Sequence, residues 1–182
     1  MKEIASVTYL TTKEDYISFK LAEKEGKTDE SDKMPIYVIG GFMLVMGLIF
    51  QVSVIRQLTL LEKNIFTVIF VVLGVFLLSY YSFIKPVAVK MTAERYCVKN
   101  TDKLVSNTIT VYDKGVKVHN DRYTADIPLI AITGGYENND VIVLYHSVNE
   151  TVFIPKRGLG TDNKNDISTH LSKNVKNYKI KK

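Results

Sequence analysis

The sequence predicts an α+β membrane protein, in which a hairpin of two transmembrane helices precedes an antiparallel β-barrel or sheet closed by a C-terminal helix. Three observations predict this class. Segments 36–55 and 65–84 contain no charged residue, although 24% of the 182 residues are charged. From Asn107 onward, short runs of alternating apolar and polar residues are separated by turn residues. Near the C-terminus, apolar residues recur at every fourth position, as on one face of a helix: Ile167, Leu171 and Val175.

The N-terminal segment, residues 1–33, is expected to form a strand and a helix on the cytoplasmic side of a membrane. Residues 4–10 have the composition of a short strand. The sequence Thr11-Thr-Lys-Glu14 matches a capping box, in which the first and fourth side chains each bond the other residue's backbone amide. The helix that follows is expected to end at Gly26. Residues 27–33 are polar and form a linker.

Segments 36–55 and 65–84 each have the length of a transmembrane helix. A hydrocarbon core about 30 Å thick is crossed by roughly 20 residues. A helix buried in a soluble core normally keeps one polar stripe, whereas these segments are apolar all round. A buried strand would end after about 10 residues. A signal peptide is also a poor match, because the first segment follows a long mixed-charge stretch and exceeds the length of a typical signal-peptide core.

Basic residues predict the orientation of the hairpin. The connection between the two segments is short, so both termini are expected on one side. Positive charges accumulate on the cytoplasmic side of membrane proteins. The hairpin loop carries only Arg56 and Lys63. The outer flanks carry more basic residues: Lys20, Lys24, Lys27, Lys33, Lys85, Lys90, Arg95 and Lys99. The sequence therefore predicts a cell-membrane protein with two spans and with cytoplasmic N- and C-termini.

Residues 86–182 are expected to form the cytoplasmic domain. Its first part, 86–100, allows two structures: Val87, Val89 and Met91 alternate as in a strand, but Met91, Arg95 and Val98 also suit a helix leaving the membrane. The remainder is expected to form a β-meander of six strands closed by a helix that Asp162 or Asn163 caps. The strands are predicted at 108–112, 116–120, 122–127, 130–137, 141–147 and 151–154.

Glycines mark two places in this meander. Gly115 follows Asp113-Lys114 and is expected to supply the positive φ of a tight hairpin turn. The pair in Thr133-Gly-Gly-Tyr136 is expected to mark a bulge or bend, because glycine in a strand often does so. The sequence lacks the Lys-Ser/Thr and the following helix that a phosphate-binding loop needs.

Several antiparallel strands closed by one C-terminal helix outline a PH-like domain, and three motifs resemble those of the YcxB-like family of bacterial membrane proteins. They are Ile127-Pro-Leu-Ile130 before a strand, Val152-Phe-Ile-Pro-Lys-Arg157 before a helix, and Thr12-Lys-Glu-Asp-Tyr16 ahead of the two spans. A Trp common in the family is Leu129 here, and Gly158-Leu159 replaces its usual aromatic after Pro-Lys-Arg. The resemblance implies a two-span anchor with a cytoplasmic PH-like domain, and it favours a helix over 86–100.

The sequence predicts no enzyme, cofactor or metal site. Cys97 is the sole cysteine, so neither an intramolecular disulfide nor a cysteine-based metal cluster can form. The three histidines lie far apart, and Asp121, Asp126 and Asp140 have no spacing that suggests a catalytic pair. The net charge of +5 is spread along the chain, whereas a nucleic-acid-binding protein usually concentrates its basic residues on one face.

The expected function is that of a membrane-anchored interaction domain. It would bind an unidentified protein or anionic lipid head groups at the inner leaflet, and the chain could form homo-oligomers. An alternative is an immunity or defence factor against a cognate bacterial toxin. The candidate contact residues are basic, although they could equally be a solvated charged surface and a solubilising tail: Lys156, Arg157, Lys173, Lys176, Lys179, Lys181 and Lys182.

Overall fold

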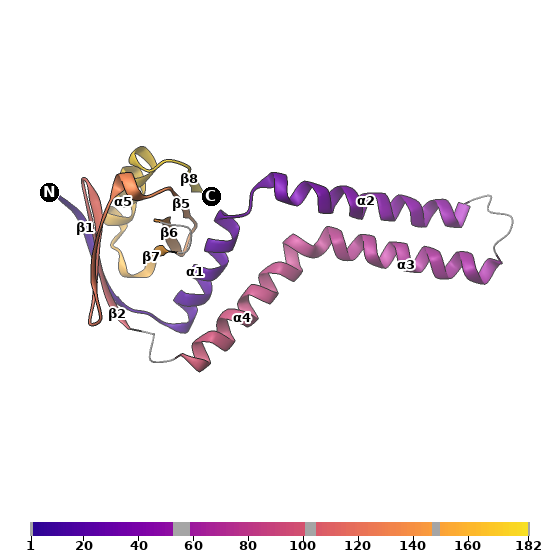
Figure 1. Cartoon of the computed structure of the whole chain (residues 1–182), viewed down its shortest axis with the longest axis horizontal. Helices are drawn as coiled ribbons and strands as arrows, with labels where there is room; N and C mark the ends of the chain where they lie inside the picture. The colour runs from indigo at the N-terminus through magenta and orange to yellow at the C-terminus, as the bar shows by residue number, and fades with distance from the viewer. Residues whose placement is uncertain (1, 53–58, 101–104, 147–149, 182) are drawn as a thin grey trace. The chain divides into compact units, whose positions relative to one another are not determined.

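The computed structural model describes residues 2–52, 59–100, 105–146 and 150–181 (Figure 1). The chain divides into two compact units. The globular unit contains Met1–Lys27 and Val89–Lys182, and the hairpin unit contains Thr28–Ala88. The N-terminal segment, predicted to be separate from residues 86–182, belongs largely to the same unit as the C-terminal half. The class is mixed α+β, as predicted.

The first sheet of the globular unit joins the N-terminal strand to three strands that follow the hairpin unit. Its order is β1-β2-β3-β4, and all its pairs are antiparallel. Thr8 of β1 lies opposite Thr108 of β2, and their hydroxyls are 2.9 Å apart. The strand predicted at the N-terminus is confirmed. The bounds of the four strands are Glu3–Leu10, Ser106–Tyr112, Gly115–Asn120 and Thr124–Pro128.

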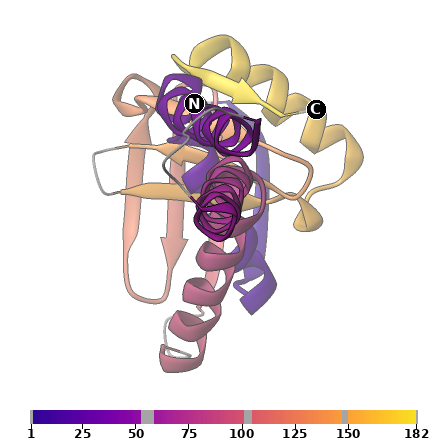
Figure 2. The same cartoon turned by 90° about the vertical axis from the view of Figure 1, so that its right-hand side faces the viewer.

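The second sheet has the order β7-β6-β5-β8. Strand β8, drawn in yellow in Figure 2, runs parallel to β5 and was not predicted from sequence. The predicted strand over 130–137 is partly wrong, because Leu129–Ala131 form a 3₁₀ turn before β5 begins. Position 147, at the end of another predicted strand, lies outside the described residues. The bounds are Gly134–Glu137, Val141–Tyr145, Thr151–Pro155 and Tyr178–Ile180.

Strand β6 is buried on both faces and separates two apolar clusters. Ile142 and Leu144 face the cluster shared with the first sheet and with helix α5 (Thr161–Asn174). Val141 and Val143 face the opposite way and pack with Phe19 and Ala22 of helix α1 (Lys13–Gly26). The alternation follows from the two-residue period of a strand. Helix α5 contributes the predicted Ile167 and Leu171, and Val175 just after it is also buried.

The two sheets do not close into a barrel, so that part of the prediction is wrong. Between β1 and β7 there is a side-chain bond in place of a strand ladder: the Tyr9 hydroxyl donates to the Phe153 carbonyl over 2.9 Å. The 3₁₀ turn at Leu129–Ala131 separates β4 from β5. A barrel needs a continuous ladder of backbone bonds at every neighbouring pair, and the strand orders end at β1, β4, β7 and β8.

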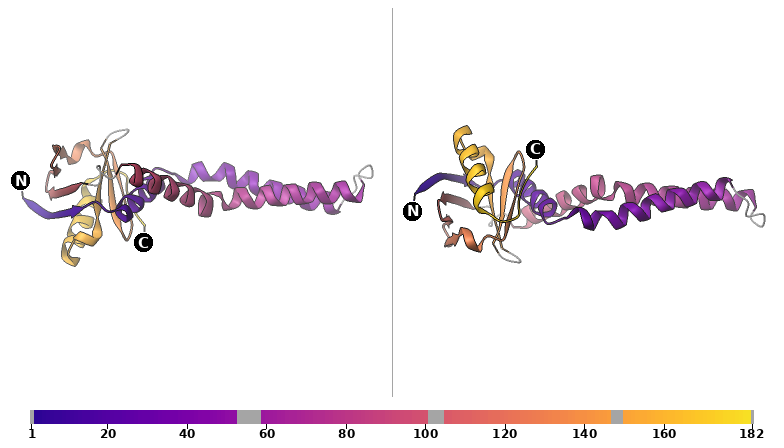
Figure 3. Two further views of the ribbon diagram at one scale, coloured as in Figure 1. Left: turned by 90° about the horizontal axis from the view of Figure 1, so that it is seen from below. Right: turned by 90° about the horizontal axis from the view of Figure 1, so that it is seen from above.

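The hairpin unit consists of α2 (Glu30–Val52) and α3 (Leu60–Ser79), which lie side by side in Figures 1 and 3. Both helices are long and apolar enough to cross a membrane. They begin before the predicted spans, and residues 53–55 of the first span are outside the described part. The helices approach closely at Gly40 and Gly74: a Cβ on Gly74 would lie 2.9 Å from the Gly40 carbonyl oxygen.

A five-residue π-helix, η1 (Tyr80–Ile84), follows α3 and leads into α4 (Lys85–Lys99). Residues 86–99 are therefore helical, which resolves the two alternatives that the sequence allowed.

The predicted capping box of α1 is shifted by one residue, because Thr12 and Asp15 form it. Helix α5 begins after Gly160 without a side-chain cap, so the predicted caps at Asp162 and Asn163 are wrong.

Gly115 and Gly135 were expected to form a turn and a bulge, but both allow close packing instead. No described glycine has a positive φ. A Cβ on Gly115 would lie 2.8 Å from the carbonyl oxygen of Ile127 on β4. A Cβ on Gly135 would lie 2.5 Å from the Tyr178 ring, which occupies that space. Both positions therefore require glycine for room, and Gly134–Glu137 pairs regularly with β6.

Candidate interaction site

Lys156, one of the predicted contact residues, forms an internal ion pair. It lies in the 3₁₀ turn Lys156–Gly158 directly after β7. Its Nζ is 2.7 Å from Oε1 of Glu137, and the two side chains are only 15% and 5% exposed. Its backbone amide donates to the Asp140 carbonyl over 2.8 Å. A partner or a membrane could therefore not use this ammonium without breaking a buried pair.

Glu137 is the centre of a polar cluster that joins four elements. Besides Lys156, the carboxylate accepts hydrogen bonds from the Ser168 hydroxyl of α5 at 2.8 Å and from the Tyr178 hydroxyl of β8 at 2.6 Å. Burial raises the pKa of Tyr178, and its bond to Glu137 raises it further, so the phenol stays protonated and donates. A buried carboxylate is tolerated when such partners satisfy it, and here they connect β5, β8, α5 and the turn after β7.

Arg157 is held in a second polar cluster at the start of α1. Its Nε donates to Asp15 Oδ1 at 2.7 Å, and one terminal nitrogen donates to Oδ2 at 2.6 Å and to the Leu10 carbonyl at 2.9 Å. Burial alone would raise the pKa of Asp15, but the hydrogen bonds from Arg157 and Thr12 outweigh it and lower that pKa. Such a bidentate pair fixes the guanidinium geometrically.

A pocket of about 300 Å³ lies beside these residues. Arg157, Lys156 and Lys164 contribute positive charge to its lining, and Glu14, Asp15 and Asp140 contribute an equal number of negative charges. Ser18 is the one hydroxyl residue of the lining, and no histidine or cysteine is present to activate it. In the described ranges, no group of three acidic, histidine or cysteine residues is arranged to hold a metal ion.

The described C-terminal lysines are exposed, as is Arg157, whose side chain is 55% exposed. Lys173, at the end of α5, and Lys176, Lys179 and Lys181 are exposed, and Lys182 lies outside the described residues. Lys181 is nevertheless anchored: its Nζ is 2.6 Å from Glu25 Oε1 and its amide donates to the Glu137 carbonyl over 2.8 Å. Of the predicted basic residues, Lys156 is thus largely buried in its ion pair, whereas Arg157 and the described C-terminal lysines are exposed.

Sequence reasoning missed the acidic partners of these residues. Asp15 could have been found from the alternative capping box Thr12-Lys-Glu-Asp15, which fits the same spacing as the predicted one. Glu137 and Tyr178 gave no signal, because pairing over such distances in the chain depends on the position of β8.

Tyrosines and a lysine cluster at one end of the hairpin unit. The Tyr81 hydroxyl donates to the Asp32 carbonyl over 3.1 Å, and Lys85 Nζ donates to the Thr28 hydroxyl over 2.7 Å. The same ammonium lies 4.7 Å from the Tyr81 ring centre, and the rings of Tyr37 and Tyr81 meet edge to face at 6.2 Å. Amphipathic rings and snorkelling lysines of this kind are typical of the boundary between hydrocarbon and water.

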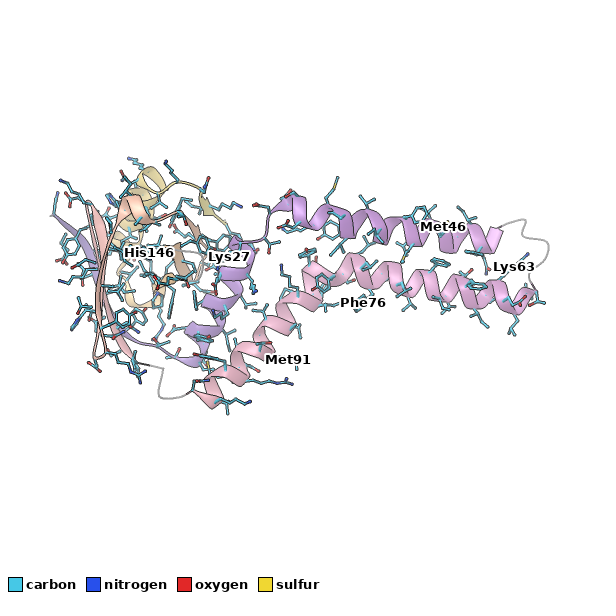
Figure 4. All side chains as sticks on the ribbon, in the orientation of Figure 1. Lys27, Met46, Lys63, Phe76, Met91 and His146 are labelled. Carbon is cyan, nitrogen blue, oxygen red and sulfur yellow. The ribbon has the colours of Figure 1, made fainter. Side chains whose placement is uncertain are left out.

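Apolar side chains project outward along the rest of the hairpin unit, as Figure 4 shows around Met46 and Phe76.

Comparisons of the chain with family models, curated proteins and solved structures found no match.

Proposed function

We propose that the protein is an integral membrane protein of a bacterium, anchored by the hairpin unit, which presents the globular unit as a PH-like interaction domain at the inner leaflet. The single observation that carries this proposal is the surface of the hairpin unit. Its large apolar side chains face outward, while Gly40, Gly47 and Gly74 face the helix–helix contact.

Both helices carry large apolar residues over the surface that faces away from their mutual contact. Phe42 is 62% exposed, Leu48 64% and Val72 60%, and many others are similar. A half-exposed large apolar side chain forfeits about 1 kcal/mol of burial energy in water. Over the whole surface this amounts to roughly 10 kcal/mol, comparable to the stability of a small domain. A bilayer removes that penalty, because lipid tails solvate these side chains.

Strand pairing supports an even number of spans. Strand β1 precedes the hairpin unit and β2 follows it, yet the two strands pair along their length. The segments on either side of the hairpin must therefore lie on one side of any membrane that the hairpin enters. The excess of lysine and arginine outside the hairpin loop supports the cytoplasm as that side.

The globular unit is better suited to binding than to catalysis. Its buried carboxylates, Glu137, Asp15 and Glu23, each have basic partners, and the positive and negative side chains that line its pocket are equal in number. The two four-stranded sheets with a C-terminal helix are consistent with a PH-like domain and with the resemblance to the YcxB-like family. We propose an unidentified cytoplasmic protein as the partner, recognised by exposed residues outside the two clusters at Glu137 and Asp15.

Cysteine labelling of the full chain in cells tests the anchorage and the orientation. Cys97 is 3% exposed and burial raises the pKa of its thiol, so it should react with an impermeant maleimide only after the cells are opened and the protein is unfolded. Leu61→Cys in a Cys97→Ala background, at an exposed position beyond the hairpin loop, should react from outside. Position 61 is preferable to the neighbouring position 59, because the Thr59 side chain caps α3.

Release of the chain from membranes by alkaline carbonate would contradict the anchorage. Labelling of residue 61 only after lysis, with the chain still in the membrane, would reverse the orientation and leave the anchorage intact.

A further inference from the structure

Helix α4 uses one of its faces to pack against α1. Ala93 and Cys97 are each 3% exposed, and the Tyr96 ring stacks on Tyr16 with centres 5.0 Å apart and planes 11° from parallel. These three residues fall on one side of a helix that turns about 100° per residue. This contact lies in the globular unit, which includes α4 from Val89 onward, and it determines which side chains of that part remain outside.

A second face of α4 is apolar and exposed. Met91 and Val98 are 48% and 73% exposed. Their spacing of seven residues places them within about 20° of one another around the helix, well away from the buried face. Met91 is labelled on this helix in Figure 4. The described part of the chain contains nothing that covers this stripe.

Basic residues flank the exposed stripe on both sides. Helix α4 carries four basic residues and one acidic residue, a net charge of 4 − 1 = +3. By the helical spacing, Lys90 lies on one side of the stripe and Arg95 and Lys99 on the other, and all three are exposed. The acidic residue, Glu94, is 3.6 Å from Lys13 of α1. An apolar stripe bordered by lysine and arginine is characteristic of a helix that rests on an anionic membrane surface.

We infer that the exposed face of α4 contacts the anionic head-group layer of the bilayer that holds the hairpin unit. The inference rests on the proposed membrane anchorage. Leu60–Lys99 is helical throughout, so α4 directly follows the apolar segment and begins at the boundary marked by Tyr81 and Lys85. A second copy of α4 is a poorer occupant, because Lys90 and Arg95 would face like charges across the contact.

The contact has a role different from anchorage. Two transmembrane helices retain the protein in the membrane whatever α4 does. Contact along α4 would fix which surface of the globular unit faces the cytoplasm, since α1 packs on α4. Each basic side chain near an anionic leaflet changes the equilibrium about fivefold, so three together change it on the order of a hundredfold.

Fluorescence quenching on the full chain in nanodiscs tests this contact. In a Cys97→Ala background, an environment-sensitive fluorophore is placed at Val98→Cys, at Met91→Cys, or at Thr169→Cys on the exposed surface of α5 as a control. We expect a nitroxide-bearing lipid to quench the labels at 91 and 98 in discs containing phosphatidylglycerol, and to leave the label at 169 unquenched. Quenching should weaken with salt and in discs of phosphatidylcholine alone.

The triple variant Lys90→Gln, Arg95→Gln, Lys99→Gln should abolish the quenching at 98, whereas Lys164→Gln, Lys173→Gln, Lys176→Gln, with the same charge removed elsewhere, should not. Equal quenching in neutral and anionic discs, or labels at 91 and 98 that iodide reaches and lipid does not, would overturn the inference. So would shielding of these positions only when an acidic protein is added. Failure of the chain to enter nanodiscs would instead refute the anchorage itself.

Discussion

The two units of this chain are built with opposite distributions of apolar residues. In the globular unit, Ile142, Leu144 and Ile154 are at most 1% exposed and charges lie on the outside or in matched pairs. In the hairpin unit, the small residues Gly40, Gly47 and Gly74 are inside, and the large apolar residues are outside. The proposed membrane anchorage would account for the difference: water drives apolar groups inward, whereas lipid leaves close packing as the main contribution to helix association.

The interactions that stabilise each unit internally differ accordingly. The helices of the hairpin unit meet through glycine contacts, stacked Phe50 and Phe70 rings, and one bond from the Thr67 hydroxyl to the Gly47 carbonyl at 3.2 Å. The elements of the globular unit meet through two apolar clusters and two polar clusters. The same kind of substitution should therefore have different effects in the two units.

The largest effect is expected for Ile154→Asp. Ile154 is completely buried between the sheets, so an unpaired carboxylate there should destabilise the globular unit by more than about 4 kcal/mol. We would record the near-ultraviolet circular dichroism of the tyrosines against temperature, with the full chain in detergent. In the variant this signal should no longer show a cooperative transition. The helical far-ultraviolet signal of the hairpin unit should persist. The matched control Ile130→Asp, at a residue that is 96% exposed, should leave the melt unchanged, and equal loss in both variants would contradict the assigned core.

A smaller loss is expected when Lys156→Met removes one partner of the buried pair. Glu137 would keep its bonds from Ser168 and Tyr178 but lose its counter-charge, at a cost of about 3 kcal/mol. Adding Glu137→Gln should restore much of the stability, measured by thermal melting at pH 7. The exposed control Lys173→Met should have no effect. A double variant no more stable than Lys156→Met would show that the charge imbalance is not the cause.

In the hairpin unit, an added methyl group should matter only at the helix contact. Gly74→Ala would place a Cβ 2.8 Å from the Leu44 side chain and should weaken the contact by about 2 kcal/mol. At Gly41 no heavy atom lies within 4 Å of such a Cβ, so Gly41→Ala should be tolerated. Spin labels at Leu48 and Ile69 should show a longer or broader distance distribution for the first variant only. Equal distributions in both variants would indicate that the contact is not limited by space.

The smallest effect concerns pH and the pair of Asp15 with Arg157. Because the folded state lowers the pKa of Asp15, the pair stabilises the fold above the ordinary carboxyl pKa of about 3.9. That contribution is lost as the pH falls through the lowered value. The destabilisation caused by Asp15→Asn should therefore be greater at pH 7 than at pH 3, in contrast to Asp121→Asn on an exposed turn. An Asp15→Asn effect that is the same at both pH values would mean that the charge contributes nothing.

Local patterns in the sequence predicted much of this structure. The two apolar segments, the N-terminal strand, the end of α1 at Gly26 and the buried face of α5 each depend on neighbouring residues, and each was found, although the strand predicted over 4–10 is Glu3–Leu10. The outcome at Gly115 shows the limit of such patterns. Its position after Asp113-Lys114 suggested a turn conformation, but its need for glycine comes from Ile127 on another strand.

The candidate site could not be predicted in the same way. Lys156 and Arg157 looked like solvated charges, because their partners Glu137 and Asp15 lie far away in the sequence. Strand β8 has only three residues, too few to show alternation, and its position depends on the space over Gly135. Closure into a barrel also depends on the edges of the sheets, which local periodicity does not specify.

The pairing of β1 with β2 has a consequence for the order of biosynthesis. Thr8 leaves the ribosome long before its partner Thr108, and the whole hairpin is translated in between. During that interval β1 has no neighbouring strand, and Ala5, Val7 and Tyr9 have no core to enter. Such late pairing slows folding and lengthens exposure to aggregation. Under the proposed membrane anchorage, a chain that inserted only one of its two helices would leave β1 and β2 in different compartments, so completion of this sheet would also act as a check on correct insertion.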